Sequence, residues 1–256
     1  MKRVAIVGGA GRMGQAMAEG LGATGRYEVV ALVDLHEPTA LFGARHETSI
    51  SQLVAGDVDA VVDFSNPKSV VASATWCAEH AVPLVIGTTG LNASERAALE
   101  TAAVSTHIVM ASNFALGAVL TERFAALAAP YFERVEIIES HHDRKVDAPS
   151  GTSISTARAI NDARTRAGRG PMKDPTERHT IEGARGADAG NGVRIHAVRL
   201  PGLVAREEVL FGGPGEGLTI RHDSYDRQSF VQGVALALEH VDETPGLTIG
   251  IASFIG

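Results

Sequence analysis

The sequence contains a single cysteine, and this scarcity excludes several classes of protein. One thiol, Cys77 in 256 residues, can form neither an internal disulfide framework nor a zinc site with several cysteine ligands. It lies beside Trp76 in a helical pattern, which favours core packing over a nucleophilic role. No segment approaches the roughly 20 apolar residues of a membrane span. The apolar run after Met1-Lys2-Arg3 is too short for a secretion signal. We therefore expect a cytoplasmic protein without a membrane partner.

A surplus of positive charge is also absent. The chain has 23 Lys and Arg against 30 Asp and Glu, a net charge of −7. Non-specific binding to nucleic acid depends on surplus basic residues, so we expect no nucleic-acid partner. The composition, 45% hydrophobic and 21% charged, is ordinary for a globular protein. The length allows one large domain or two smaller ones.

Strands and helices alternate over the first 110 or so residues. Short apolar, β-branched runs predict strands at 4–7, 29–33, 58–64, 84–86 and 108–110. Helices are predicted after the glycines at 8–14, ending near Gly22 or Gly25, and over 67–80 and 92–104. Such alternation predicts a parallel sheet with helices on both faces. We thus expect an α/β protein with a Rossmann-type, doubly wound sheet.

The pattern changes in the second half of the chain. Helices are predicted over 114–129 and 152–166, and a strand over 135–138. A long loop over 168–192 precedes strands at 193–200, 203–211 and 217–222, interpreted as an antiparallel meander and not a βαβ unit. A last helix, 227–241, precedes an apolar segment at 247–251. The second domain is therefore expected to be α+β, built on an open mixed or antiparallel sheet. We predict domains at 1–112 plus 223–256 and at 113–222.

A glycine-rich segment follows the first predicted strand. Residues 9–14, Gly-Ala-Gly-Arg-Met-Gly, match G-x-G-x-x-G, and Asp34 ends the next strand 20 residues later. Glycines let the backbone approach a pyrophosphate, the helix start supplies N–H groups, and the acidic residue suits the ribose 2′-hydroxyl of NAD. The alternative is a glycine turn with a purely structural role.

The most polar segment is residues 141–152, His-His-Asp-Arg-Lys-Val-Asp-Ala-Pro-Ser-Gly-Thr, directly after an apolar strand. Two histidines and a lysine can give protons near neutral pH or hold an anion. The helix start at Ser150-Gly151-Thr152 offers N–H groups and a hydroxyl to a carboxylate. The alternative is a solvated loop capped by Ser150. A metal site is disfavoured, because adjacent side chains on an extended chain point to opposite sides.

Two further segments follow strands and carry weaker signals. Residues 87–90, Gly-Thr-Thr-Gly, could face the ribose of a nicotinamide nucleotide or could form a simple turn. Residues 111–114, Ala-Ser-Asn-Phe, open a predicted helix, and Asn113 could be an ordinary cap.

Taken together in their order, these motifs resemble a known family. The glycine loop with Arg-Met-Gly, Val-Asp-Phe-Ser at 62–65, Gly-Thr-Thr-Gly at 87–90, Asn113-Phe114 and above all Glu-Ser-His-His-Asp-Arg-Lys-Val-Asp-Ala-Pro-Ser-Gly-Thr at 139–152 look like 4-hydroxy-tetrahydrodipicolinate reductase. This family, formerly called dihydrodipicolinate reductase, acts in the diaminopimelate route to lysine. The resemblance runs nearly end to end, and the long histidine-containing string is highly specific.

The resemblance implies a role for each matched position. The positions expected to bind the cofactor's pyrophosphate are Gly8, Gly9, Ala10, Gly11, Arg12 and Met13, and Asp34 is expected to bind its adenosine ribose. Those expected to line the nicotinamide end are Gly87, Thr88, Thr89, Ala111, Ser112, Asn113 and Phe114. The expected catalytic residues are His141, a proton donor or acceptor, and Lys145, a proton donor. The expected substrate-binding residues are His142, Gly151 and Thr152, and no metal is implied.

The same resemblance implies an oxidoreductase that uses NADH or NADPH to reduce a small dicarboxylate. It also implies a homotetramer built through the sheets of the second domain, and a hinge between a dinucleotide-binding and a substrate-binding domain. Closure of such domains would exclude water from the bound cofactor.

The sequence departs from the family pattern at two places. Some members carry an arginine just after the acidic residue, whereas Leu35-His36 follow Asp34 here, so we expect NADH to serve at least as well as NADPH. Many members have Gly-Glu-His where this chain has Ala205-Arg206-Glu207. We expect the second departure to lie away from the matched chemistry and to affect the interface or the hinge.

Two other functions stay open on the sequence alone. Another two-domain NAD(P)-dependent dehydrogenase, acting on homoserine or aspartate, predicts a different polar cluster in the second domain. A non-catalytic dinucleotide-sensing protein predicts replacement of His141 or Lys145, and neither is replaced.

Overall fold

The computed structural model describes residues 1–256 and divides into two compact units. Unit 1 comprises Met1–Ala115 and Arg227–Gly256, and unit 2 comprises Leu116–Asp226. The chain therefore passes between the units twice, at 115/116 and at 226/227. The predicted boundaries were 112/113 and 222/223.

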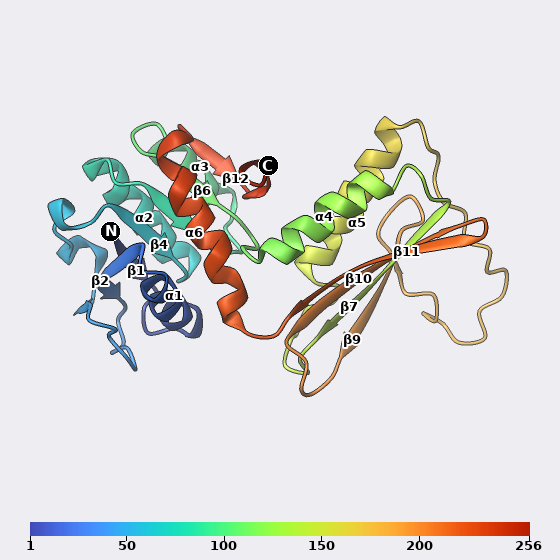
Figure 1. Ribbon diagram of the computed structural model, residues 1–256, viewed down its shortest axis with the longest axis horizontal. Coiled ribbons are helices and arrows are strands. Elements are labelled where there is room, and N and C mark those ends of the chain that lie inside the picture. The colour runs from blue at the N-terminus through green and yellow to red at the C-terminus, as the bar shows by residue number, and fades with distance from the viewer. The chain divides into compact units, whose positions relative to one another are not determined.

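Unit 1 is built on a seven-stranded, wholly parallel sheet (Figure 1). In spatial order its strands are β12 (Leu247–Ile249), β6 (Ile108–Met110), β5 (Leu84–Ile86), β4 (Ala60–Asp63), β1 (Lys2–Val7), β2 (Tyr27–Val33) and β3 (Arg45–Glu47). The central strands are buried on both faces, which is why they read as continuous apolar runs. The predicted Rossmann-type sheet is confirmed, with β3 as an edge strand that the sequence did not indicate.

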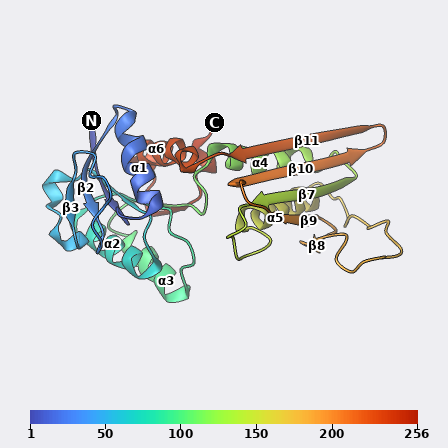
Figure 2. The same cartoon turned by 90° about the horizontal axis from the view of Figure 1, so that it is seen from below.

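Helices cover both faces of this sheet (Figure 2). The four helices are α1 (Arg12–Ala23), α2 (Pro67–His80), α3 (Ala93–Ala102) and α6 (Val231–His240). α2 and α3 pack their apolar side chains into one core with the sheet, and Cys77 is fully buried there, as predicted. α1 and α6 contact each other on the opposite face. Short 3₁₀ turns occur at 50–52, 55–57, 227–230, 241–243 and 252–254.

Unit 2 is a five-stranded sheet with two helices on one face (Figures 1 and 2). In spatial order the strands are β11 (Glu216–Ser224), β10 (Ala205–Gly213), β7 (Arg134–His141), β9 (Arg194–Arg199) and β8 (Ala187–Asp188). The helices are α4 (Leu116–Ala128) and α5 (Gly151–Arg166), which share a core with Val135, Ile137 and Val209. The predicted mixed sheet is confirmed.

The predicted meander, in contrast, is wrong. β7 lies between β9 and β10, and it runs parallel to β9 and antiparallel to β10. Parallel neighbours need a long crossover, and α5 with the 167–193 segment supplies it, so β7, α5 and β9 form a βαβ unit. Only β10 and β11 form the expected hairpin.

β7 is also longer than its apolar pattern predicts. It continues through Glu139, Ser140 and His141, and Glu139 occupies the inward position that Val135 and Ile137 occupy earlier. A strand that replaces apolar by buried polar side chains loses its hydrophobic signal without ending.

No helix of the structure is long and apolar enough to cross a membrane.

Candidate active site

The glycine loop lies at the carboxyl end of β1, where it turns into α1. Gly8 has a φ of +82°, and a Cβ on Gly14 would lie 2.1 Å from the Gly8 carbonyl oxygen. Only glycine is compatible with such a left-handed turn and such a close backbone approach. No side chain caps α1 at Gly11, so the helix start can offer its N–H groups to an anion.

Asp34 follows β2 and lies beside this loop. Its carboxylate accepts hydrogen bonds from the N–H of Ala10, at 3.1 Å, and of His36, at 3.0 Å. Its own carbonyl is 2.9 Å from Nε2 of His46. These contacts bring the predicted ribose-binding carboxylate and the predicted pyrophosphate loop together.

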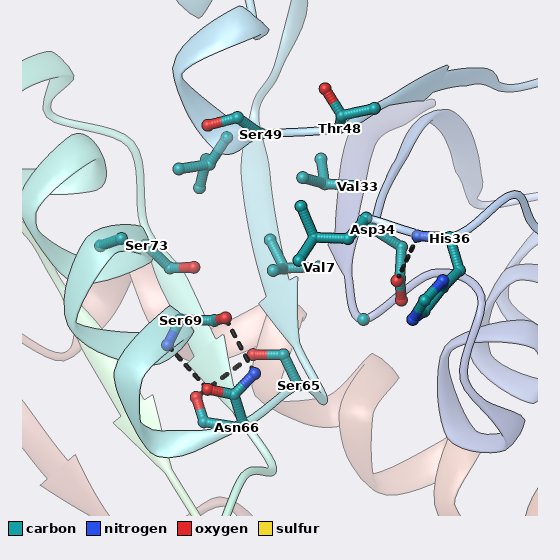
Figure 3. Close-up of a pocket in the computed structure, with 14 residues that line it drawn as sticks. Val7, Val33, Asp34, His36, Thr48, Ser49, Ser65, Asn66, Ser69 and Ser73 are labelled. Atoms are coloured by element: carbon teal, nitrogen blue, oxygen red, sulfur yellow. Dashed lines mark hydrogen bonds between the residues drawn. The ribbon is translucent and has the colours of Figure 1, made fainter.

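A cavity of about 350 Å³ opens at Asp34 (Figure 3). Asp34 and His36 lie on one side of it, and Ser65, Asn66, Ser69 and Ser73 lie on the other. The lining residues are Val7, Gly8, Val33, Asp34, Leu35, His36, Thr48, Ser49, Ile50, Ser65, Asn66, Ser69, Ala72 and Ser73. The cavity is thus lined by hydroxyls, apolar side chains and a carboxylate, with neither lysine nor arginine.

Asp63, at the end of β4, connects this edge of the sheet to the 87–90 segment. Its fully buried carboxylate accepts hydrogen bonds from the hydroxyls of Ser65 at 2.5 Å, Ser73 at 2.6 Å and Thr88 at 3.0 Å. Burial raises the pKa of this carboxyl, against the effect of those hydrogen bonds. The sequence assigned no role to Asp63, because contacts between separate loops leave no local signal.

The Phe64 ring packs against Gly87 and Phe114, two of the residues predicted to line the nicotinamide end. A Cβ on Gly87 would lie 2.0 Å from the Phe64 ring, and Phe64 meets Phe114 edge to face with ring centroids 5.9 Å apart. Asn113 accepts a hydrogen bond from the N–H of Ala115, and α4 begins only at Leu116, two residues later than predicted. Segments 87–89 and 111–114 therefore lie at the carboxyl edge shared by the glycine loop.

Unit 2 carries the second polar group, at the end of β7. His141 places Nδ1 2.6 Å from Oε2 of Glu139. Arg199 of β9 contacts Glu139 with both terminal nitrogens, each at 2.8 Å, and the N–H of Ser150 donates to Oε1 at 3.2 Å. Glu139 itself is fully buried.

Charges and burial tune this group in opposite directions. Burial opposes ionisation of Glu139, yet hydrogen bonds from Arg199 and His141 outweigh it and hold the Glu139 pKa below its usual value. Burial also lowers the pKa of His141, against the effect of the Glu139 carboxylate. His141 is therefore a largely neutral imidazole at pH 7 with a carboxylate on Nδ1, a common arrangement for a group that exchanges protons.

Lys145 lies on the loop after β7, where it pairs with Asp147. Its ammonium is 2.8 Å from both Asp147 oxygens, and that hydrogen bond lowers the pKa of Asp147. His142, next to His141, buries Nδ1 without a hydrogen-bond partner. A buried polar atom without a partner in a polar loop is an opening for a ligand.

The start of α5 completes the group. Ser150 is its N-cap and its hydroxyl accepts a hydrogen bond from the N–H of Ser153 at 3.2 Å, so the predicted cap is confirmed. Gly151 and Thr152 form the first turn, next in sequence to the N–H that binds Glu139. The structure thus brings together Glu139, His141, Ser150 and Arg199, with Lys145 held nearby through Asp147.

The expectation for Ala205-Arg206-Glu207 is wrong. β10 pairs with β7 so that Ala205 lies opposite His141 and Glu207 opposite Glu139, next to the matched chemistry. Glu207 is buried and accepts the hydroxyls of Ser153, at 2.5 Å, and Thr156, at 2.7 Å. Burial raises its pKa. The error came from the strand order, since a meander would have placed β10 beside β9.

No group of three or more His, Cys, Asp or Glu side chains in the structure could hold a metal ion.

Sequence models of one family match nearly all of the chain. The dihydrodipicolinate reductase N-terminus matches residues 2–114, and the C-terminus of the same family matches residues 117–255. Proteins named 4-hydroxy-tetrahydrodipicolinate reductase from Corynebacterium aurimucosum and Nocardia farcinica are 42% and 45% identical to it. Each alignment covers 99% of this chain and 98% of the relative.

Solved structures agree. Dipicolinate-bound dihydrodipicolinate reductase from Paenisporosarcina sp. TG-14 superposes with a TM-score of 0.85 at 39% identity, covering 99% of both chains. A probable dehydrogenase from Thermotoga maritima, at 13% identity and a TM-score of 0.66, shares the fold alone. With its two halves matched in order and its polar strand end intact, this chain belongs to the dihydrodipicolinate reductase family.

Proposed function

We propose that this protein catalyses the NAD(P)H-dependent reduction of 4-hydroxy-tetrahydrodipicolinate to tetrahydrodipicolinate, with loss of water, in the diaminopimelate route to lysine. The observation that carries the proposal is the intact group of Glu139, His141, Lys145 and the α5 start in a chain related to such reductases along its full length. A homoserine or aspartate dehydrogenase is not favoured, since neither explains that group.

The residues of unit 1 fit a nicotinamide dinucleotide. Gly8 and Gly14 have no side chain, so the backbone of the loop turns back closely on itself, and no side chain caps the start of α1. This arrangement suits a pyrophosphate, which residues Gly8 to Met13 would bind. Asp34 would accept the adenosine ribose hydroxyls, and segments 87–89 and 111–114 would line the nicotinamide end. When bound, the reduced nicotinamide supplies the hydride.

The residues of unit 2 would bind the dicarboxylate and move a proton. The α5 N–H groups, the Thr152 hydroxyl and the His142 side chain suit carboxylates, and Lys145 adds positive charge. Loss of water would remove the hydroxyl from C4, protonated by His141 or Lys145, and a proton from C3; C4 would receive the hydride and a proton would return to C3. A positioned proton donor lowers the barrier to losing a poor leaving group.

The direct test of this function follows NADH absorbance with substrate made in situ by the preceding synthase of the pathway. We expect NADH oxidation that depends on both the protein and the synthase. Homoserine and aspartate with NAD⁺ serve as parallel substrates. Turnover of either of these, with none of the dicarboxylate, would refute the proposal.

For cofactor choice, we propose that NADH serves at least as well as NADPH. Asp34 repels a 2′-phosphate, and the cavity around it offers neither lysine nor arginine. Arg12, within the glycine loop, offsets part of this repulsion, so both cofactors should bind. The measurement is kcat/KM for each cofactor. An NADPH preference of about 100-fold, roughly 2.7 kcal/mol, would contradict this assignment.

For assembly, we propose a homotetramer formed through the unit 2 sheets. The face of that sheet opposite α4 and α5 carries Ile138 and Leu210 among ion-paired side chains, such as Glu208 with Arg221. Sedimentation equilibrium measures the state directly, and a monomer at micromolar concentration would contradict the proposal.

A further inference from the structure

We propose that Glu139 and Arg199 are positioning residues that together orient His141, the Lys145 loop and the start of α5. This inference rests on the proposed function, because it assigns the support of that site. Neither residue was singled out from the sequence, where they stand 60 positions apart.

Glu139 is the point where three segments meet. Its two oxygens receive four hydrogen bonds: two from Arg199 of β9, one from the His141 ring on β7, and one from the Ser150 N–H that begins α5. Glu139 and His141 are two residues apart on one strand, so their side chains leave the same face of the sheet. A carboxylate with no exposure and four donors has a single favourable orientation.

Arg199 extends this arrangement to the lysine loop. β9 runs parallel to β7 with Arg199 in register with His141, which lets the guanidinium reach back to Glu139. The same guanidinium donates to the Asp147 carbonyl at 2.7 Å. The Asp147 carboxylate in turn holds the Lys145 ammonium. The Arg199 guanidinium, which is planar and always charged, therefore orients both Glu139, which contacts His141, and Asp147, which holds Lys145.

The consequence for His141 is a fixed ring. Nδ1 faces Glu139, so Nε2 is the nitrogen left to exchange a proton with the substrate. The neutral imidazole should carry its proton on Nδ1, because that atom faces a carboxylate, so Nε2 accepts a proton in the neutral form and donates one only from the imidazolium. Arg199 compensates the charge of Glu139, so the carboxylate stays ionised in a buried place and can support an imidazolium as it forms.

Glu207 provides a matched control. It is the partner of Glu139 in the β7–β10 register and is likewise buried on the helix face. Its carboxylate accepts hydrogen bonds from the hydroxyls of Ser153 and Thr156, on α5. Glu207→Gln therefore removes a neighbouring buried carboxyl without touching the positioning pair.

The kinetic test compares Glu139→Gln, Glu139→Asp, Arg199→Lys and Glu207→Gln with the wild type. Glu139→Gln should lower kcat by about 10- to 100-fold, less than the 10²–10⁴-fold that a general acid is worth altogether. Its basic limb of kcat/KM should move to lower pH, because the carboxylate that raises the His141 pKa is gone. Glu139→Asp should move the basic limb part of the way back to its wild-type position. Arg199→Lys should lower kcat. Glu207→Gln should leave both kcat and the basic limb unchanged.

A second readout does not depend on turnover. Nitrogen-15 spectra of labelled histidine should show wild-type His141 with its proton on Nδ1, and a lower titration midpoint in Glu139→Gln. NADH binding, a property of unit 1, should stay intact in every variant, and dispersed signals of the unit 2 histidines in the same spectra should report that unit 2 is folded. A wild type without reductase activity would refute the proposed function and leave the spectra to test the pair. An active wild type with an unshifted, fully active Glu139→Gln would overturn the positioning role alone.

Discussion

At the scale of single residues, a substitution of Lys145 distinguishes proton donation from substrate binding. It is held by Asp147, at the end of a loop closed by Pro149. If it donates the proton, Lys145→Ala should lower kcat by at least about 10²-fold. NADH binding should be nearly unchanged, because the glycine loop and Asp34 belong to unit 1.

Steady-state kinetics with an NADH titration checks this outcome. A variant that changes only KM would make Lys145 a binding residue and leave the acid role to His141. Loss of NADH binding would contradict the assignment of cofactor and substrate residues to different units.

Thr152 tests the carboxylate site at the same scale. It stands in the first turn of α5, two residues after Ser150, whose N–H binds Glu139. Thr152→Val keeps the shape and removes a hydroxyl donor to a charged group, worth about 1.5–3 kcal/mol, so KM should rise roughly 10- to 150-fold. Thr165→Val, near the far end of the same helix, is the matched control. An unchanged KM in a folded Thr152→Val protein would contradict the site.

At the scale of elements, local chemistry determined what could be predicted. α2 was predicted at its observed bounds because Asn66 caps it and Pro67 occupies its first position. α3 begins where Asn92 and Glu95 form a capping box. The order of β7, β9 and β10 was not predictable, since strand pairing depends on partners far along the chain. For the same reason Asp63 and Arg199 were given no role, and Ala205-Arg206-Glu207 was expected to lie away from the site.

Glu207, which β10 places opposite Glu139, should make the free energy of unfolding depend on pH. Its pKa is raised by burial, so between the unfolded and the folded pKa the folded state holds a proton that the unfolded state has released. This carboxyl therefore favours folding below its unfolded pKa, and that contribution is lost as pH rises towards its folded pKa.

Glu207→Gln removes this dependence and keeps a polar side chain for both hydroxyls. The variant should have a higher free energy of unfolding than the wild type at pH 7, and the difference should shrink as pH falls through the acid range. Urea unfolding at several pH values measures it. A variant less stable than the wild type at pH 7 would contradict a raised Glu207 pKa.

At the scale of the whole molecule, the sequence predicts two domains, and the resemblance implies a role for each. The alternation of strands and helices is a local property that is repeated, so the parallel sheet could be predicted well. The site of unit 2 depends on residues drawn from β7, β9 and α5. Its two histidines, its lysine and the helix start at Ser150-Gly151-Thr152 stood out along the chain, whereas Arg199 did not.

The two chain crossings have a consequence for synthesis on the ribosome. Unit 2 is continuous, whereas unit 1 lacks α6 and β12 until residues 227–256 emerge. α6 is an integral part of that unit: a Cβ on Gly20 of α1 would lie 2.4 Å from Val231, and the Tyr27 hydroxyl donates to the Ala235 carbonyl. The part made first should thus be finished last, the reverse of the usual N-terminal-first order. Nascent chains arrested with residues 1–226 outside the ribosome should protect 116–226 from protease before 1–115, and earlier protection of 1–115 would contradict this order.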